Sequence, residues 1–220
     1  FDVIKLDGEF KKIDDLRVGS AVLLNRFLQH LADKNLSGLE ILSGIPGTIG
    51  GAIFGNAGSK YGCILDFVRS VKIMDFEGNV KVFDKKDLDY GYRKSGISKD
   101  SIILEVEFDS TKFKNIDSEK IKILMKEILK EKVAGQPYDE LSAGCVFKNC
   151  EGISTGKMID ELGLKGLSRG KVKVSEKHGN FFVVEKDAKF KDFIDLIEEI
   201  RDKIYNSKQI RLEVELNIWE

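Results

Sequence analysis

The apolar residues of this chain recur at two different spacings, and each spacing predicts a different element. Residues 21–34, 118–131 and 188–205 carry apolar side chains three and four positions apart, which predicts three amphipathic helices. Residues 68–83 contain two short apolar runs separated by Glu77-Gly78-Asn79, the pattern of a β-hairpin. The chain therefore mixes helices with antiparallel strands.

Three further segments complete this pattern. Leu104, Val106 and Phe108 alternate with glutamates, which predicts a half-buried strand, and the same alternation over residues 212–218 predicts a last strand. Residues 155–162 read as a short helix that Gly163 ends. Because helices and strands are interspersed, the predicted fold class is α+β. The charged stretch at residues 109–120 suggests two domains, 1–110 and 111–220.

Composition and charge exclude several classes of partner. The 220 residues include 36 lysines and arginines against 37 acids, a net charge of −1, so we expect neither nucleic acid nor a membrane surface as partner. No apolar run reaches the roughly 18 residues of a transmembrane helix. Three cysteines without motif spacing fit a reducing compartment rather than a disulfide framework. The spacing of Cys145, Cys150 and His178 matches no familiar zinc pattern, so we expect no metal site.

Glycines gather between Gly44 and Gly62, where seven of the chain's 21 glycines lie. Glycine lets the backbone approach a ligand closely, and consecutive backbone N–H groups can bind a pyrophosphate without a basic side chain. The run has neither the Walker loop pattern nor the Rossmann fingerprint. A loop with tight turns explains the same residues.

Polar residues at four other places have the types that catalysis or binding uses. Tyr92-Arg93 can present a hydroxyl and a guanidinium to a carboxylate or phosphate, although an exposed turn explains it too. Cys145 lies among small residues and can donate a proton or attack, although most cysteines are structural. His178 and the Glu213/Glu215 pair have structural explanations as well, a satisfied histidine and the solvated face of an edge strand.

Taken in order, these segments resemble one family, the UDP-N-acetylenolpyruvoylglucosamine reductases (MurB). Each motif alone is a modest signal, but the ordered set spans nearly the whole chain. The matching segments are 44–51, 56–58, 91–95, 142–149, 163–166, 174–178 and 212–215. The resemblance implies the second lobe of a vanillyl-alcohol-oxidase-type FAD-binding domain, followed by a MurB-type C-terminal substrate-binding domain whose last strand carries a catalytic glutamate.

The resemblance also implies an activity in peptidoglycan synthesis. NADPH reduces FAD, and the flavin N5 passes a hydride to UDP-N-acetylglucosamine enolpyruvate, which gives UDP-N-acetylmuramate. The implied enzyme is a cytoplasmic monomer. The residues expected to contact FAD are Gly44, Ile45, Pro46, Gly47, Thr48, Gly50, Gly51, Ala52, Asn56 and Gly58. The residues expected to hold the substrate are Tyr92, Arg93, Lys148 and Asn149, and those expected to be catalytic are Arg93, Cys145 and Glu215.

Two departures from the family pattern qualify this expectation. The family normally has a serine where this chain has Cys145, and a thiol is far more acidic than an alcohol, so we expect Cys145 to act as proton donor. The family's N-terminal lobe with its Gly-Ser-Asn motif is also absent from the sequence, which leaves one wall of the flavin site. The alternative function is therefore a non-catalytic nucleotide-sugar-binding fragment with an incomplete flavin site.

Overall fold

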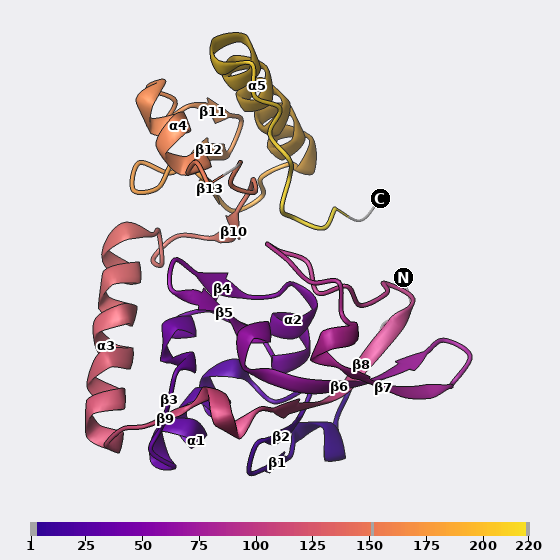
Figure 1. Ribbon diagram of the computed structural model, residues 1–220. Helices are drawn as coiled ribbons and strands as arrows, with labels where there is room; N and C mark the ends of the chain where they lie inside the picture. Colours follow the sequence, from indigo (N-terminus) through magenta and orange to yellow (C-terminus); the bar gives the residue numbers. More distant parts are fainter. Residues whose placement is uncertain (1–3, 151, 219–220) are drawn as a thin grey trace. The chain divides into compact units, whose positions relative to one another are not determined.

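The computed structural model describes residues 4–150 and 152–218, and its contacts divide the chain into two compact units. Unit 1 ends at Lys130 and unit 2 begins at Glu131. Each unit combines helices with an antiparallel sheet, as Figure 1 shows, so the predicted α+β class is confirmed. The two units are described separately below.

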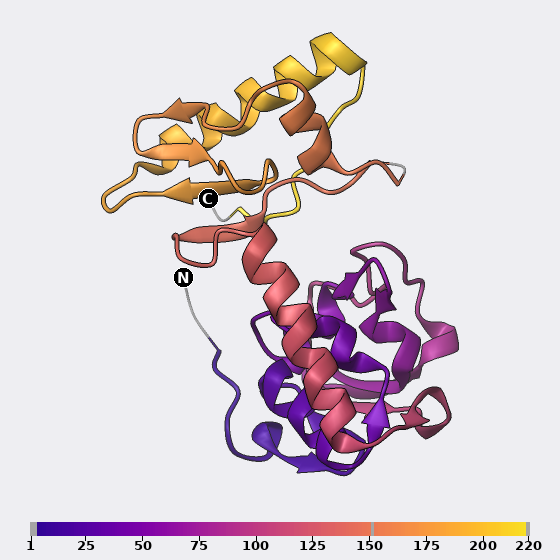
Figure 2. The same cartoon turned by 90° about the vertical axis from the view of Figure 1, so that its left-hand side faces the viewer.

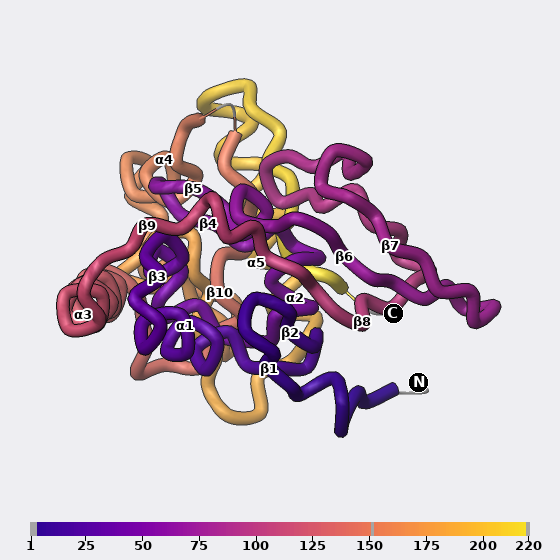
Figure 3. Tube along the Cα trace, turned by 60° about the horizontal axis from the view of Figure 1, so that its bottom comes forward, coloured from indigo at the N-terminus to yellow at the C-terminus, as the bar shows by residue number. Residues whose placement is uncertain are grey.

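A five-stranded antiparallel sheet forms the centre of unit 1. Its strands, in spatial order, are β1 (Ile13–Asp14), β2 (Arg17–Gly19), β8 (Ser101–Phe108), β6 (Val68–Asp75) and β7 (Val80–Asp84). The predicted hairpin is confirmed as β6 and β7, which Figure 3 shows projecting together at one edge of the sheet. The small strand pairs of this unit are β3 (Leu36–Ser37) with β9 (Lys114–Asn115), and β4 (Gly58–Ser59) with β5 (Gly62–Cys63).

The core of unit 1 lies between this sheet and two helices, α1 (Leu24–Asp33) and α2 (Ile49–Phe54). Phe27 of α1 is fully buried, and its ring centroid lies 4.7 Å from that of Phe108 on β8. The helix predicted over 21–34 is therefore confirmed, with its apolar stripe packed on the sheet. The single-turn 3-10 helices of this unit are η1 (Gly8–Lys11), η2 (Leu39–Leu42), η3 (Ile64–Phe67), η4 (Lys85–Asp87) and η5 (Ser110–Lys112).

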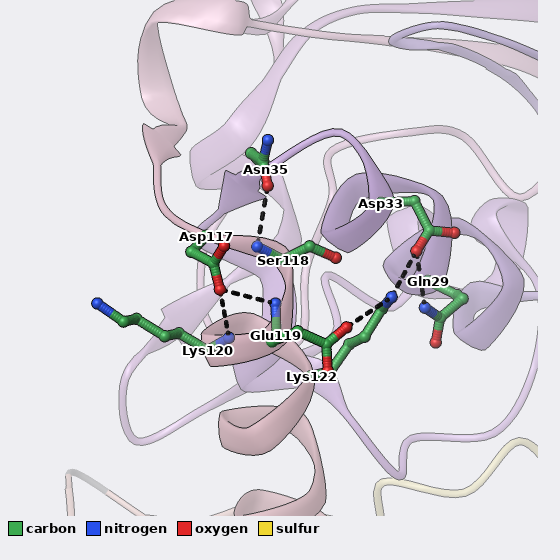
Figure 4. A network of polar contacts seen from close by, with 8 residues as sticks. All are labelled: Gln29, Asp33, Asn35, Asp117, Ser118, Glu119, Lys120 and Lys122. Atoms are coloured by element: carbon green, nitrogen blue, oxygen red, sulfur yellow. Dashed lines mark hydrogen bonds and ion pairs between the residues drawn. The ribbon is translucent and has the colours of Figure 1, made fainter.

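Helix α3 (Ser118–Gly135) begins on unit 1, where a polar network holds its first turn (Figure 4). Asp117 accepts hydrogen bonds from the N–H groups of Glu119 at 3.1 Å and Lys120 at 3.4 Å, which caps the helix. Asn35 accepts from the Ser118 N–H at 2.9 Å. The charged stretch at 109–120 thus belongs to unit 1, because β9 pairs with β3 and α3 starts beside α1. The contacts therefore divide the chain later than the domain boundary expected near residue 110.

Unit 2 is a four-stranded antiparallel sheet covered by helices. Its strands, in spatial order, are β10 (Ser142–Cys145), β13 (Phe181–Val184), β12 (Val172–Val174) and β11 (Ser168–Arg169). Figure 2 shows the long helix α5 (Phe190–Lys208) lying across this sheet, next to the short α4 (Thr155–Glu161). Their shared core is centred on fully buried residues such as Phe147, Phe182 and Ile200. The two helices predicted for this half are confirmed.

The last strand predicted over residues 212–218 is wrong. Over 212–218 the structure forms a single antiparallel bridge, between Val214 and Phe147. The alternation of apolar and polar residues is real, and Leu212 is buried. Cys150 exchanges its backbone hydrogen bonds with Ile153, however, so the partner segment offers too few groups for a ladder. Alternation of residue types therefore did not predict strand pairing here.

Among the described helices, none is both long enough and apolar enough to cross a bilayer.

We expect Asp117→Ala to lower the free energy of unfolding by about 1 kcal/mol, because the first N–H groups of α3 lose their cap. Urea titrations followed by circular dichroism measure the change. Asp202→Ala, at an exposed position of α5, is the matched control and should leave stability nearly unchanged. Equal midpoints for the two variants would contradict the capping role.

Candidate functional site

The glycine-rich run of unit 1 leads into α2 and exposes its backbone. Thr48 is the N-cap of α2 and its hydroxyl accepts from the Gly51 N–H at 3.4 Å. Gly47 is exposed, has φ of +115° and has open space where a side chain would lie. Gly51 is also exposed. A ligand can approach such a backbone closely, so the exposed part of the run leaves room for the FAD expected from the sequence.

Other glycines of the run serve the packing of the loop itself. A Cβ on Gly50 would lie 3.0 Å from the Ser20 Cβ, and the Gly50 N–H donates to the Ser20 carbonyl at 2.8 Å. A Cβ on Gly58 would lie 2.9 Å from the Gly62 carbonyl across the β4–β5 pair. Ala52 is buried in the core of unit 1. These residues hold the loop in shape, whereas Ile45, Pro46, Gly47 and Gly51 lie partly or fully exposed.

Asn56 connects this run to the segment that carries Tyr92 and Arg93. Its side chain is buried, its Nδ2 donates to the Gly91 carbonyl at 2.8 Å, and its Oδ1 accepts from the Leu65 N–H at 3.4 Å. The two candidate elements of unit 1 are therefore joined by one carboxamide. This contact was not predicted from the sequence, where Asn56 was considered only for the cofactor.

Tyr92 and Arg93 form the tip of a tight turn. Gly91 and Lys94 exchange two backbone hydrogen bonds of 2.9 and 3.1 Å, and Arg93 has a left-handed φ of +55°. The Arg93 guanidinium lies 5.2 Å from the centre of the Tyr92 ring, and Tyr92 is 55% exposed. A guanidinium is planar and carries several N–H donors, so this turn can present them to a carboxylate or phosphate.

In unit 2, the segment from Cys145 to Asn149 lies beside the C-terminal segment. The Glu215 N–H donates to the Val146 carbonyl at 2.8 Å, and the Lys148 N–H donates to the Glu213 carbonyl at 2.8 Å. The Lys148 ammonium also pairs with the Glu213 carboxylate at 2.5 Å. The structure thus brings Cys145, Lys148 and Glu215 into one small region, although they are far apart in the sequence.

The other end of this segment is attached to α4. The Thr155 N–H donates to Asn149 Oδ1 at 3.1 Å, and the Thr155 hydroxyl donates to the Lys148 carbonyl at 2.6 Å. Thr155 is fully buried, whereas Asn149 is exposed and Cys145 is half-buried. Sequence reasoning missed Thr155, since a threonine at the start of a helix is ordinary.

The contacts of His178 are those of a structural histidine. Its Nδ1 accepts from the Asn180 N–H at 3.2 Å, and its ring lies edge-on to Phe181 at 4.8 Å. Burial lowers the pKa of His178, and the nearby Lys165 lowers it further. The accepted hydrogen bond also requires an unprotonated Nδ1. The histidine is therefore held neutral in the folded protein.

Over the described residues, no group of three or more histidine, cysteine and acidic side chains is arranged to hold a metal ion.

The comparisons with known proteins agree with the two units. Residues 2–84 match a model described as an FAD binding domain, and residues 136–219 match the C-terminal domain of UDP-N-acetylenolpyruvoylglucosamine reductase. The reductase of that name from Clostridioides difficile is 39% identical over 98% of this chain and 72% of its own length. The chain belongs to this reductase family.

Further relatives support the same assignment. The reductase from Alkaliphilus oremlandii is 37% identical over 98% of this chain and 72% of its own length. The crystal structure of the Thermus caldophilus reductase (MurB) superposes with a TM-score of 0.86 at 37% identity, and covers 98% of this chain and 77% of that one. The family expected from the motifs is confirmed. It is a family of oxidoreductases that use FAD and NADPH in peptidoglycan synthesis.

The glycine-rich run lies inside the FAD-binding match, and the Cys145 and Glu215 segments lie inside the C-terminal match. The individual roles of the candidate residues stay predictions.

The lowered pKa of His178 predicts a pH effect on stability. In the unfolded chain a histidine titrates near 6.5, so acidification protonates the unfolded chain before the folded protein. The free energy of unfolding therefore decreases as the pH falls below that value. We expect His178→Gln to lose less stability between pH 7.5 and 5.5 than the parent does. Urea titrations at the two pH values measure this difference, and equal losses in both proteins would argue against a neutral His178.

Proposed function

We propose that this chain reduces UDP-N-acetylglucosamine enolpyruvate to UDP-N-acetylmuramate, with FAD as cofactor and NADPH as reductant. Membership in the reductase family supports the reaction. The observation that carries it is the bond from the Glu215 N–H to the Val146 carbonyl in unit 2, which places Glu215 beside the residue that follows the half-buried Cys145. We further propose that it works as a monomer in the cytoplasm.

In this proposal the two domains bind different molecules. The N-terminal domain binds the flavin through the exposed backbone around Gly47 and Gly51, and the C-terminal domain binds the nucleotide sugar. When bound, FAD that NADPH has reduced supplies the hydride for the enolpyruvyl β-carbon. The matches over 2–84 and 136–219 support a boundary between them.

Charged and polar side chains hold the substrate in this reading. Arg93, planar and stacked on Tyr92, faces the enolpyruvyl carboxylate, where negative charge develops as the hydride adds. Lys148 and Asn149 bind the rest of the substrate. The Lys148 ammonium is oriented by Glu213, and the Asn149 carboxamide by the Thr155 N–H.

Cys145 and Glu215 then complete the reaction. Hydride addition at the β-carbon leaves an electron pair on the α-carbon, and the Cys145 thiol donates its proton there as general acid. Glu215 lies near the carboxylate end of the substrate in this proposal, where the positive charge of Arg93 stabilises the negative charge that develops. The thiolate recovers a proton from water, so one hydride and one proton are added per turnover. A thiol in place of the family's usual serine is suited to this step because it releases its proton more readily.

A direct test is substrate-dependent oxidation of NADPH by the purified chain. We expect a yellow protein that oxidises NADPH only when the enolpyruvyl nucleotide sugar is present. A colourless protein that still binds the nucleotide sugar would favour the alternative of a non-catalytic binding fragment.

Replacing the thiol separates the two half-reactions. We expect Cys145→Ala to leave reduction of the flavin by NADPH unchanged and to slow its reoxidation by substrate by about 100-fold or more, the contribution of a positioned general acid. Cys145→Ser should retain reoxidation, because a hydroxyl can also donate the proton. Stopped-flow measurement of flavin absorbance follows both steps.

Cys150→Ala is the matched control, since this half-buried thiol lies five positions further along the same segment. It should leave both half-reactions near their parent rates. Normal reoxidation in Cys145→Ala would remove Cys145 from the role of acid.

A further inference from the structure

Beside the Cys145–Asn149 segment, the side chain of Asn180 makes backbone hydrogen bonds of the kind that a neighbouring strand makes. Its Oδ1 accepts from the Phe147 N–H at 2.9 Å, and its Nδ2 donates to the Phe147 carbonyl at 2.7 Å. Its own backbone carbonyl accepts from the Val146 N–H at 2.8 Å. Asn180 is only 2% exposed, so these bonds form away from water.

The path of the chain explains why a side chain is needed here. Strand β10 pairs with β13 up to Cys145, which lies opposite Phe181. Because β13 begins at Phe181, it has no residue that could pair with Val146 or Phe147. The backbone preceding it forms a turn closed by the bond from the Phe181 N–H to the His178 carbonyl. The turn is pressed against α4, since a Cβ on Gly179 would lie 2.5 Å from the Gly156 carbonyl. The backbone of Asn180 is thus held by this turn and by α4, apart from the contact of its side chain with Phe147.

A carboxamide carries both a donor and an acceptor, so the Asn180 side chain can bond both backbone groups of one residue. The N–H and carbonyl of Phe147 are thereby satisfied on one side. On the other side, Glu215 binds the carbonyl of Val146 and Glu213 binds the N–H of Lys148. Val146 and Phe147 are buried between these two sets of bonds, which leaves the backbone on either side of them little freedom.

We propose that Asn180 is a positioning residue for the substrate half-reaction: its carboxamide holds the Phe147 backbone and thereby sets the places of Cys145, Lys148 and Asn149. The inference rests on the function proposed above. It assigns to Asn180 no contact with substrate or cofactor. A small misplacement of reacting groups is sufficient to slow catalysis by about a hundred-fold, so a purely positional role predicts a large effect on one half-reaction.

The kinetic test uses Asn180→Ala and Asn180→Asp in the FAD-loaded protein. We expect reoxidation of the flavin by substrate to fall by roughly ten- to a hundred-fold in both variants, while reduction by NADPH stays within about two-fold. Below the pKa of the new carboxyl, Asn180→Asp regains an O–H donor for the Phe147 carbonyl. The reoxidation rate of Asn180→Asp relative to Asn180→Ala should therefore rise as the pH is lowered. His178 is present in both variants, so its titration cancels in this ratio.

Ile200→Ala is the control for a loss of stability alone, because Ile200 is fully buried in the same core but lies on α5. It should not separate the two half-reactions. If the Asn180 variants behave as Ile200→Ala does, or if the ratio of the two variants does not change with pH, the inference is overturned.

Hydrogen exchange tests the inference without the activity. In Asn180→Ala the Phe147 amide should exchange at least about ten-fold faster than in the parent, whereas the Lys148 amide, bonded to the Glu213 carbonyl, should keep its protection. Unchanged protection at Phe147 would overturn the inference by itself. A parent protein that the substrate cannot reoxidise would instead refute the proposed function, and the exchange result would still decide whether Asn180 holds the segment.

Discussion

Buried backbone groups that no strand reaches must find hydrogen-bond partners, and both halves of this protein solve that problem with an asparagine. In unit 2 the Asn180 carboxamide satisfies both backbone groups of Phe147. In unit 1 the Asn56 carboxamide accepts from the buried Leu65 N–H, and it also donates to the carbonyl of the half-buried Gly91. Each carboxamide favours one conformation of the segment that it bonds, since leaving a buried polar group unsatisfied costs about 1–3 kcal/mol. The segments that carry the candidate residues are irregular, and these bonds give them defined shapes.

The two units therefore support their candidate residues in a similar way, with different elements. In unit 1 a glycine-rich run exposes backbone before a short helix, and a tight turn presents Arg93 stacked on Tyr92. In unit 2 two stretches that are distant in the sequence lie side by side. Lys148 pairs with Glu213 there, and Val146, which follows Cys145, bonds to Glu215. In both units, rigid sheets with covering helices support segments that have little regular structure themselves.

Local patterns predicted most of the regular elements correctly. The α1 and α5 helices follow apolar stripes, and the β6–β7 hairpin follows its Gly78-Asn79 turn. The same reasoning failed at residues 212–218, because alternation reports which side is buried and does not report whether a neighbour is long enough to pair. Ordered motifs identified the family, whereas composition alone left the glycine-rich run undecided between a ligand loop and a turn.

The contacts within the site were the part that sequence could not supply. Asn180 lies two positions beyond the matching segment 174–178, but its partner Phe147 is 33 positions away, and no spacing rule links an asparagine to a distant backbone. Thr155 was missed for a different reason, since its bond to the Lys148 carbonyl is not visible in the sequence and a threonine at a helix start is ordinary. Such bonds depend on tertiary placement, which periodicity does not encode.

The close approach of Gly156 and Gly179 has a consequence for how mutational data on this protein should be read. A Cβ on Gly156 would lie 2.9 Å from His178, and one on Gly179 would lie 2.5 Å from the Gly156 carbonyl, so α4 and the turn tolerate no side chain at their contact. A scan of single substitutions would therefore give these two glycines sensitivities as high as those of reactive groups. Their intolerance would reflect the closeness of two backbones, and it would not mark a place where a ligand binds.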